Sequence, residues 1–246
     1  MPVEPTIAPE IFALRPDFAA LSIYAEDVRN KPSDAHSETL LRDACLALDS
    51  APWAEAHLAS WRDAYRAFGA KPQRTPCSVE ALRKRAQRDG MLPTVNAVVD
   101  LYNALSLRHA LPVGGEDAAL YEGSPHLIRA AGDEPFDTVA EGAPRIETAE
   151  QGEVVWRDDR GITCRRWNWR QGIRTRITEH STRMWFVLER LEPMPIEALL
   201  EAGENLIEGL QRLSPGVRTS RLYLDASGRS NPHGEARHDP WPARMR

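Results

Sequence analysis

The spacing of apolar residues changes along the chain, and this change limits the folds that the sequence can form. Residues 37–109 carry apolar side chains at intervals of three and four, the spacing of helices with one buried face. Residues 112–190 carry short apolar runs separated by Gly, Pro and Asp, which is typical of strands and turns. Helical spacing returns at 195–213. We therefore expect a helical segment followed by a segment that is mostly strand.

The same patterns predict the individual elements. A first strand is expected at 18–28, because apolar and β-branched residues end there at Asn30-Lys31-Pro32. Ser78 is the expected N-cap of a helix that ends before Gly90. The expected helices are 37–48, 53–68, 79–88, 94–109 and 195–213. The expected strands are 126–130, a run around Val139, 153–157, 163–167 and 185–188.

Length and composition favour one globular domain. The 246 residues are 42% hydrophobic and 27% charged, which is ordinary for a folded chain. We expect one domain over residues 1–213, with an N-terminal strand and helices. Residues 214–246 are rich in Arg, Pro, Gly and Ser, and we expect them to form a flexible C-terminal tail.

Several classes of protein are excluded by what the sequence lacks. No apolar run is long enough to span a membrane and no signal peptide is evident, so we expect a cytoplasmic protein without a membrane partner. The three cysteines are widely spaced, which indicates neither a disulfide framework nor a metal site. The motifs GxSxG, HExxH, GxxxxGK[ST] and GxGxxG are absent. We expect no metal and no cofactor.

Basic and aromatic residues are concentrated in one segment, although the net charge is -5. Residues 164–176 hold five arginines, two tryptophans and an asparagine. Guanidinium groups bind phosphate and indole rings stack on unpaired bases, so this mixture suits a single-stranded RNA end. The candidate contacts are Arg165, Trp167, Trp169, Arg170 and Arg174. A structural alternative is that the tryptophans are core residues and the arginines pair with Glu153, Asp158 or Asp159.

A second candidate is a polar line on the helix predicted at 94–109. Asn96, Asp100 and Asn103 follow one another at intervals of four and three, which places them on one helical face. Carboxamide and carboxylate groups in such a line can bind an α-amino group, a ribose hydroxyl or a water molecule. The alternative is an ordinary solvated face.

Four segments together resemble a known family. The run LPTVNAVVDLYNALSL is followed by LPVGGED, then YEG, then HLIRAA. This order is similar to the B3/B4 domain of the bacterial phenylalanyl-tRNA synthetase β subunit. WRDAYRAFGAKP and RRWNWRQ resemble more narrowly the free-standing relatives of that domain. The resemblance covers about residues 15–195.

The resemblance implies a three-layer α+β fold and hydrolysis of an amino acid wrongly esterified to tRNA. It matches Asn103 to an asparagine of the editing pocket, and Glu189 to a pocket glutamate. At the position of a pocket histidine this chain has Gly114, and its RRWNWR segment replaces a glycine-rich loop. Because these changes fall on the pocket, the amino acid that is removed is left open.

The functional hypothesis is a trans-editing aminoacyl-tRNA deacylase that needs no metal. Asn103 and Asn168 would position the substrate or a water molecule, and Glu189 would contact the amino group or the water. Arg166 would hold a phosphate or donate to the ester carbonyl. The partners would be the aminoacylated end of tRNA and an aminoacyl-tRNA synthetase. The alternatives are a non-catalytic RNA-binding module and an interaction protein that has kept only the fold.

Overall fold

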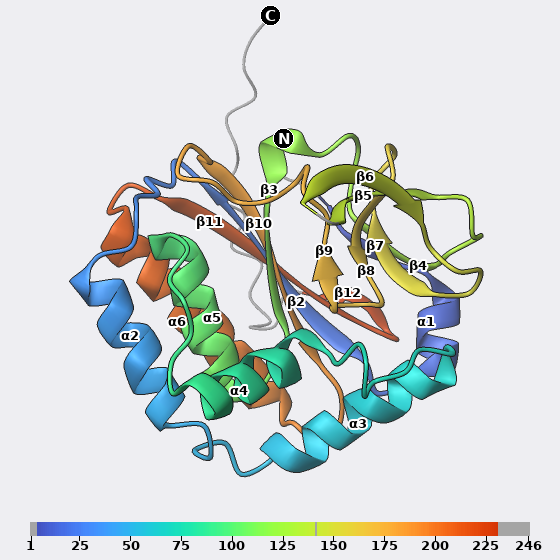
Figure 1. Cartoon of the computed structure of the whole chain (residues 1–246), viewed down its shortest axis with the longest axis horizontal. Helices are drawn as coiled ribbons and strands as arrows, with labels where there is room; N and C mark the ends of the chain where they lie inside the picture. Colours follow the sequence, from blue (N-terminus) through green and yellow to red (C-terminus); the bar gives the residue numbers. More distant parts are fainter. Residues whose placement is uncertain (1–3, 141, 231–246) are drawn as a thin grey trace, which may run out of the picture.

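The computed structural model describes residues 4–140 and 142–230, which form three layers (Figure 1). A layer of helices covers one face of a five-stranded sheet, and a second sheet packs on the other face. The helices are α1 (Pro9–Leu14), α2 (Ala35–Leu46), α3 (Ala54–Ala67), α4 (Ser78–Asp89), α5 (Ala97–His109) and α6 (Ile196–Leu213), with a 3-10 turn at Ala118–Leu120. This is the α+β arrangement expected from the sequence.

The five-stranded sheet has the order β12-β11-β2-β10-β3, and all its neighbours are antiparallel. Its strands are β2 (Ala19–Glu26), β3 (Val113–Asp117), β10 (Arg183–Arg190), β11 (Arg218–Asp225) and β12 (Gly228–Ser230). Side chains of β2 alternate between two cores, as the two-residue repeat of a strand requires. Leu21 and Ile23 face α5 and α6, whereas Ala20 packs toward the second sheet.

The second sheet has the order β1-β4-β7-β8-β5-β6, with β9 paired to β8. Its strands are β1 (Thr6–Ile7), β4 (His126–Arg129), β5 (Pro135–Ala140), β6 (Ala143–Thr148), β7 (Val154–Arg157), β8 (Ile162–Arg165) and β9 (Arg170–Gln171). Four tryptophans fill the core between this sheet, the first sheet and α3, and each is at most 2% exposed. They are Trp61, Trp156, Trp167 and Trp185.

The expected helices and the first strand are present, with ends shifted by a few residues. Cys77, not Ser78, is the N-cap of α4, and no side chain bonds to that helix end. From residue 218 the chain forms a strand where a flexible tail was expected. Arg218–Leu224 pair with Glu26–Ala20 of β2. Tyr223 and Leu224 are buried there, so tertiary pairing orders a segment of weak local pattern. Residues 231–246 lie outside the described part.

The position of α6 depends on a close approach to the sheet. Gly203 is buried in α6, and a Cβ atom at this position would lie 2.2 Å from Leu21 Cδ2 of β2. Gly203→Ala should therefore lower the free energy of unfolding by about 1–2 kcal/mol, because the overpacking exceeds the gain in helix propensity. Gly216→Ala is the control, since nothing lies within 4 Å of a Cβ atom there. Urea denaturation of both variants measures the effect, and an unchanged midpoint for Gly203→Ala would contradict this packing.

Candidate functional site

A cavity of about 270 Å³ lies where the three layers meet. Strands β3 and β10 contribute its floor, α4 and α5 contribute one side, and β7, β8 and residues 167–169 contribute the other. Its main polar and aromatic residues are Tyr102, Asn103, Glu116, Trp156, Asn168 and Glu189. A larger cavity of about 510 Å³ lies among α2, α5 and α6, but no buried carboxylate lines it. Buried ionisable groups mark the first cavity as the candidate site.

Strand alternation places two glutamates on the cavity floor. In β10, Trp185, Val187 and Glu189 line the cavity, while the residues between them enter the helical core. Glu116 of β3 lies opposite Trp185 in the sheet. Since Trp185 and Glu189 are four residues apart, the Cα atoms of Glu116 and Glu189 are separated by roughly 13 Å along the strands. The two carboxylates therefore occupy opposite ends of the floor.

Two side-chain donors hold Glu189 in the floor of the cavity. Its side chain accepts hydrogen bonds from Trp156 Nε1 at 3.0 Å and from Asn168 Nδ2 at 2.8 Å. Burial raises the pKa of Glu189 to about 7, although these donors favour the ionised form and lower it. Such a group exchanges a proton near neutral pH, which suits a general base.

Asn168 connects Glu189 to the helical side of the molecule. Tyr65 of α3 donates its hydroxyl to Asn168 Oδ1 at 2.8 Å, so the amide of Asn168 has a fixed orientation. Its backbone position is set by an unusual loop, in which Arg166 has φ 46° and Trp167 has φ 67°. Non-glycine residues seldom adopt this left-handed region. Trp167 stabilises the loop because its ring packs edge-on against Phe18 and Trp61, with centroid distances of 5.0 and 5.3 Å.

Glu116 was not singled out in the sequence. It is 4% exposed, accepts a hydrogen bond from the Tyr121 hydroxyl, and lies beside the backbone carbonyl of Gly115, to which Gln171 Nε2 donates at 3.0 Å. Burial raises the pKa of Glu116 to about 7. The one sign of it in the sequence is an acidic residue in the short segment VGGED, which follows the helix predicted at 94–109.

Two hydrogen-bond donors at the cavity have no partner in the described part of the chain. They are Ser78 Oγ of α4 and Trp167 Nε1, both of which are buried atoms. Trp167 Nε1 misses hydrogen-bonding geometry with Glu189 but is near enough to favour its ionised form. A buried donor without a partner is costly, and both of these atoms belong to residues of the cavity wall.

The polar line predicted on α5 is divided by the structure. Asn103 is half-buried and lines the cavity. Asn96 is instead the N-cap of α5 and accepts from Val99 N at 3.0 Å. Asp100 is fully buried and accepts from Val95 N at 2.8 Å and from the Ser33 hydroxyl at 2.5 Å. Asn96 and Asp100 therefore stabilise the start of the helix and lie away from the cavity.

Gly114 lines the cavity floor. A Cβ atom at Gly114 would lie 3.2 Å from Val187 Cγ1 on the neighbouring strand. This contact is tighter than ordinary van der Waals packing, so the floor has little room for a side chain at this position.

The arginine-rich segment forms β8, β9 and the loop between them, and two of its arginines are internally paired. Arg165 binds Glu153, with distances of 2.9 Å from Nε and 2.7 Å from Nη2. Arg174 binds Asp158 through both terminal nitrogens at 2.8 Å. These pairs match the structural alternative for the segment, in which the arginines neutralise buried carboxylates.

Trp169, Arg166 and Arg170 lie nearer to solvent. Trp169 is half-buried, with the guanidinium carbons of Arg166 and Arg170 at 4.6 and 5.8 Å from its ring centroid. Trp169 lines the cavity, whereas Arg166 lines a neighbouring cleft. Asn103, Asn168, Glu189, Gly114, Trp167 and Trp169 are thus brought together at the cavity. Arg165, Arg166, Arg170 and Arg174 do not line it.

Besides Glu189, the ionisable groups that line the cavity include Glu116 and the thiol of Cys164. Within residues 4–140 and 142–230, no three His, Cys, Asp or Glu side chains are arranged to hold a metal ion. No helix in the same part of the chain is long and apolar enough to cross a membrane. The chemistry that these residues can support is proton transfer by Glu189 and hydrogen bonding by the amides, indoles and hydroxyl around it.

The model of the B3/4 domain family matches residues 60–202, which is more than half of the chain, and the chain therefore belongs to this family. The matched range contains every residue that lines the cavity. The resemblance inferred from the sequence is confirmed, and so is the α+β fold class.

A solved structure was also found to be similar. It is an N-terminal fragment of the phenylalanyl-tRNA synthetase β subunit from Pyrococcus horikoshii, with 12% sequence identity and a TM-score of 0.46. The similarity covers 88% of this chain and 50% of the fragment, so the chain spans half the length of that structure. No curated protein matches the chain.

The raised pKa of Glu116 predicts a pH-dependent stability. A carboxyl group with a folded pKa of about 7 and an ordinary unfolded value binds more protons when folded, so its contribution is complete at low pH and is lost as the pH rises to 7. Glu116→Gln removes this titration. Relative to the wild type, the variant should gain about 2 kcal/mol in free energy of unfolding between pH 5 and pH 8. Urea denaturation at both pH values tests this, and parallel pH profiles would show that Glu116 is not protonated at neutral pH.

Proposed function

We propose that this protein is a trans-editing deacylase, which hydrolyses the ester between a wrongly attached amino acid and tRNA. The observation that carries the proposal is Glu189, a buried carboxylate with a pKa of about 7 at the floor of a cavity lined by tryptophans. Membership of the B3/4 family and the position of Asn103 beside the same cavity support it. The proposed partner is the aminoacylated end of tRNA, delivered in the cytoplasm with or without a synthetase.

The proposed reaction needs one base and a set of donors. Ionised Glu189 accepts a proton from a water molecule as the water oxygen attacks the ester carbonyl carbon. The bond between that carbon and the ribose oxygen then breaks, and the proton passes to the departing oxygen. The products are a free amino acid and tRNA. Asn168 holds Glu189 in place, and Tyr65 fixes the orientation of Asn168.

Negative charge develops on the ester carbonyl oxygen during the attack, and hydrogen-bond donors stabilise it. Ser78 Oγ and Trp167 Nε1 are the unpartnered donors at the cavity, and Asn103 adds an amide. We assign the oxygen to this group of donors. Arg166 lines the neighbouring cleft instead of the cavity, where it is placed to meet a phosphate and not the ester carbonyl.

The cavity volume limits what enters. About 270 Å³ is near the lower end of small-molecule sites, so it holds an aminoacyl group and leaves the nucleotides outside. Tyr102, Trp156 and Trp185 offer apolar surface to the amino acid side chain. The family's pocket histidine is replaced here by Gly114, and Val187 leaves little room for a side chain at this position. The polar contact of that histidine is therefore absent from the proposed site.

A panel of mischarged tRNAs tests the proposal directly. The wild type should release one or a few amino acids faster than buffer does. Glu189→Gln should lower the single-turnover rate by roughly 100-fold or more, since general base catalysis contributes at least that factor. Asn103→Ala should also lower it. Glu197→Gln, at an exposed position of α6, is the matched control and should leave the rate unchanged.

The pH dependence gives a separate signature. After subtraction of the buffer rate, deacylation should rise tenfold per pH unit below about pH 7 and then level off, because only ionised Glu189 acts as the base. Residual activity of Glu189→Gln should lack this rise. If no tRNA in the panel is deacylated but tRNA still binds, the protein is the non-catalytic RNA-binding module.

A further inference from the structure

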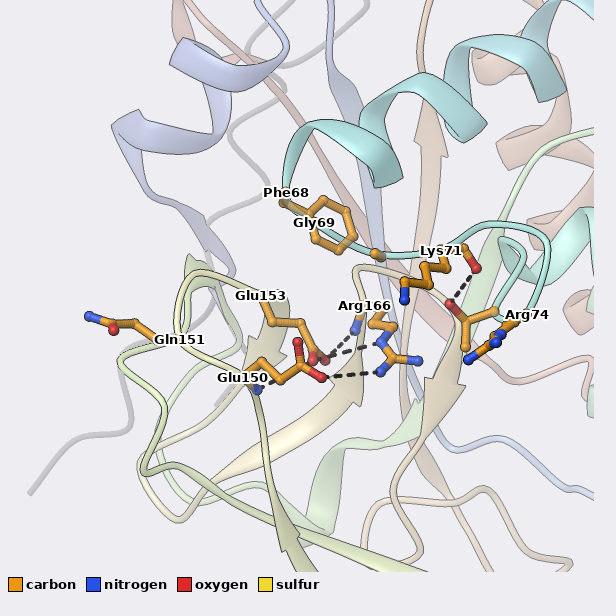
Figure 2. Close-up of a pocket in the computed structure, with 10 residues that line it drawn as sticks. Phe68, Gly69, Lys71, Arg74, Glu150, Gln151, Glu153 and Arg166 are labelled. Carbon is orange, nitrogen blue, oxygen red and sulfur yellow. Dashed lines mark hydrogen bonds and ion pairs between the residues drawn. The ribbon is translucent and has the colours of Figure 1, made fainter.

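A second cleft lies directly beside the candidate site. It has a volume of about 290 Å³ and is formed by the segment after α3 and by the turn between β6 and β7 (Figure 2). Phe68 and Gly69 lie at its apolar end, and Lys71, Arg74 and Arg166 supply its positive charges. Figure 2 shows Arg166 between these two cations and the carboxylates of Glu150 and Glu153.

The positive charges of this cleft are largely uncommitted. Lys71 and Arg74 are exposed, and neither forms an ion pair with another described residue. The backbone nitrogen of Arg166 donates to Glu153 at 3.0 Å, but its guanidinium has only distant carboxylate contacts, 3.8 Å to Glu153 and 4.0 Å to Glu150. Glu153 already accepts two short hydrogen bonds from Arg165 and is neutralised by it. An anion in the cleft would therefore gain ion pairs without breaking strong ones.

The local chain is built to direct these cations into the cleft. Gly69 has φ 90°, a value that favours glycine, and it turns the chain sharply after α3. The backbone nitrogens of Arg74 and Thr75 both donate to the carbonyl of Lys71 at 2.9 Å, which closes a compact turn. Lys71 and Arg74 consequently stand at the two ends of one turn, and Figure 2 shows both on the side of Arg166 that faces away from Glu150 and Glu153.

The cleft and the cavity share one wall. Arg166 lines the cleft, while the next three residues of the same loop, Trp167, Asn168 and Trp169, line the cavity. Trp169 is half-buried, and Arg166 lies 4.6 Å from its ring centroid. A strand that leaves the cavity thus meets an aromatic ring and then a cluster of cations. This is the order of contacts that a base and its phosphate require.

We propose that the cleft of Lys71, Arg74 and Arg166 is a phosphate subsite for the RNA strand whose aminoacylated end enters the cavity. The proposal rests on the proposed function, which supplies the strand. Trp169 stacks with the terminal or penultimate base, and the backbone phosphate next to it lies among the three cations. The subsite governs binding of the RNA and takes no part in hydrolysis.

The test is a double variant, Lys71→Ala with Arg74→Ala. Both side chains are exposed, so the fold should be retained. The dissociation constant for uncharged tRNA should rise roughly tenfold, and the slope of log K against log salt should become shallower by about 0.7, the value for one lost phosphate contact on a single strand. The control is Arg42→Ala with Arg212→Ala, which removes the same charge from exposed positions on α2 and α6. It should bind as the wild type does.

Kinetics separate this proposal from the proposed function. On a tRNA that the wild type deacylates, the double variant should show a raised KM and an unchanged rate at saturation. If the wild type deacylates tRNA and the double variant matches it in KM, affinity and salt slope, the subsite is overturned while the deacylase stands. If no tRNA is deacylated but the double variant loses binding and the control does not, the subsite stands as an RNA contact.

Inorganic phosphate distinguishes the source of the anion. Free phosphate at millimolar concentration should compete with tRNA only weakly, because the subsite meets one phosphate of a longer strand. If added phosphate weakens tRNA binding equally in the wild type and the double variant, the phosphate acts at another site. That result would contradict the proposal. A larger loss in the wild type supports it.

Discussion

The burial of one indole ring holds the candidate site together. Trp167 occupies a left-handed backbone conformation that costs free energy, and its edge-on packing on Phe18 and Trp61 compensates for that cost. Because the ring is fixed, the residues on either side of it are directed to opposite sides of the loop. Asn168 reaches Glu189 in the cavity, and Arg166 reaches the neighbouring cleft. The two subsites therefore have a fixed relation to each other.

Much of the fold could be predicted from local patterns. The helical stripes, the first strand and most strands of the second half were recognised from apolar spacing. β11 was not, because Arg218–Asp225 alternates weakly and becomes a strand only by pairing with β2. The order of strands in the two sheets depends on contacts between distant segments, which periodicity does not describe.

The candidate site was predicted in part, and the reasons differ from residue to residue. Asn103, Asn168 and Glu189 do meet at one cavity. Asn96 was grouped with Asn103 because the helix was expected from residue 94. The helix begins at Ala97, which makes Asn96 the residue that caps its first turn. Arg165 and Arg174 illustrate a different limit, since a sequence does not reveal whether a guanidinium meets a phosphate or a buried carboxylate.

The central position of β2 has a consequence for synthesis of the protein. The cavity floor belongs to β10, which pairs along its whole length with β2, and Trp185 Nε1 bonds to Ser22 Oγ across 163 residues of sequence. A ribosome must therefore complete most of the chain before the floor can assemble. Until β10 is made, Trp61 and Trp156 lack part of the core that buries them, and the nascent chain exposes these two indole rings to solvent.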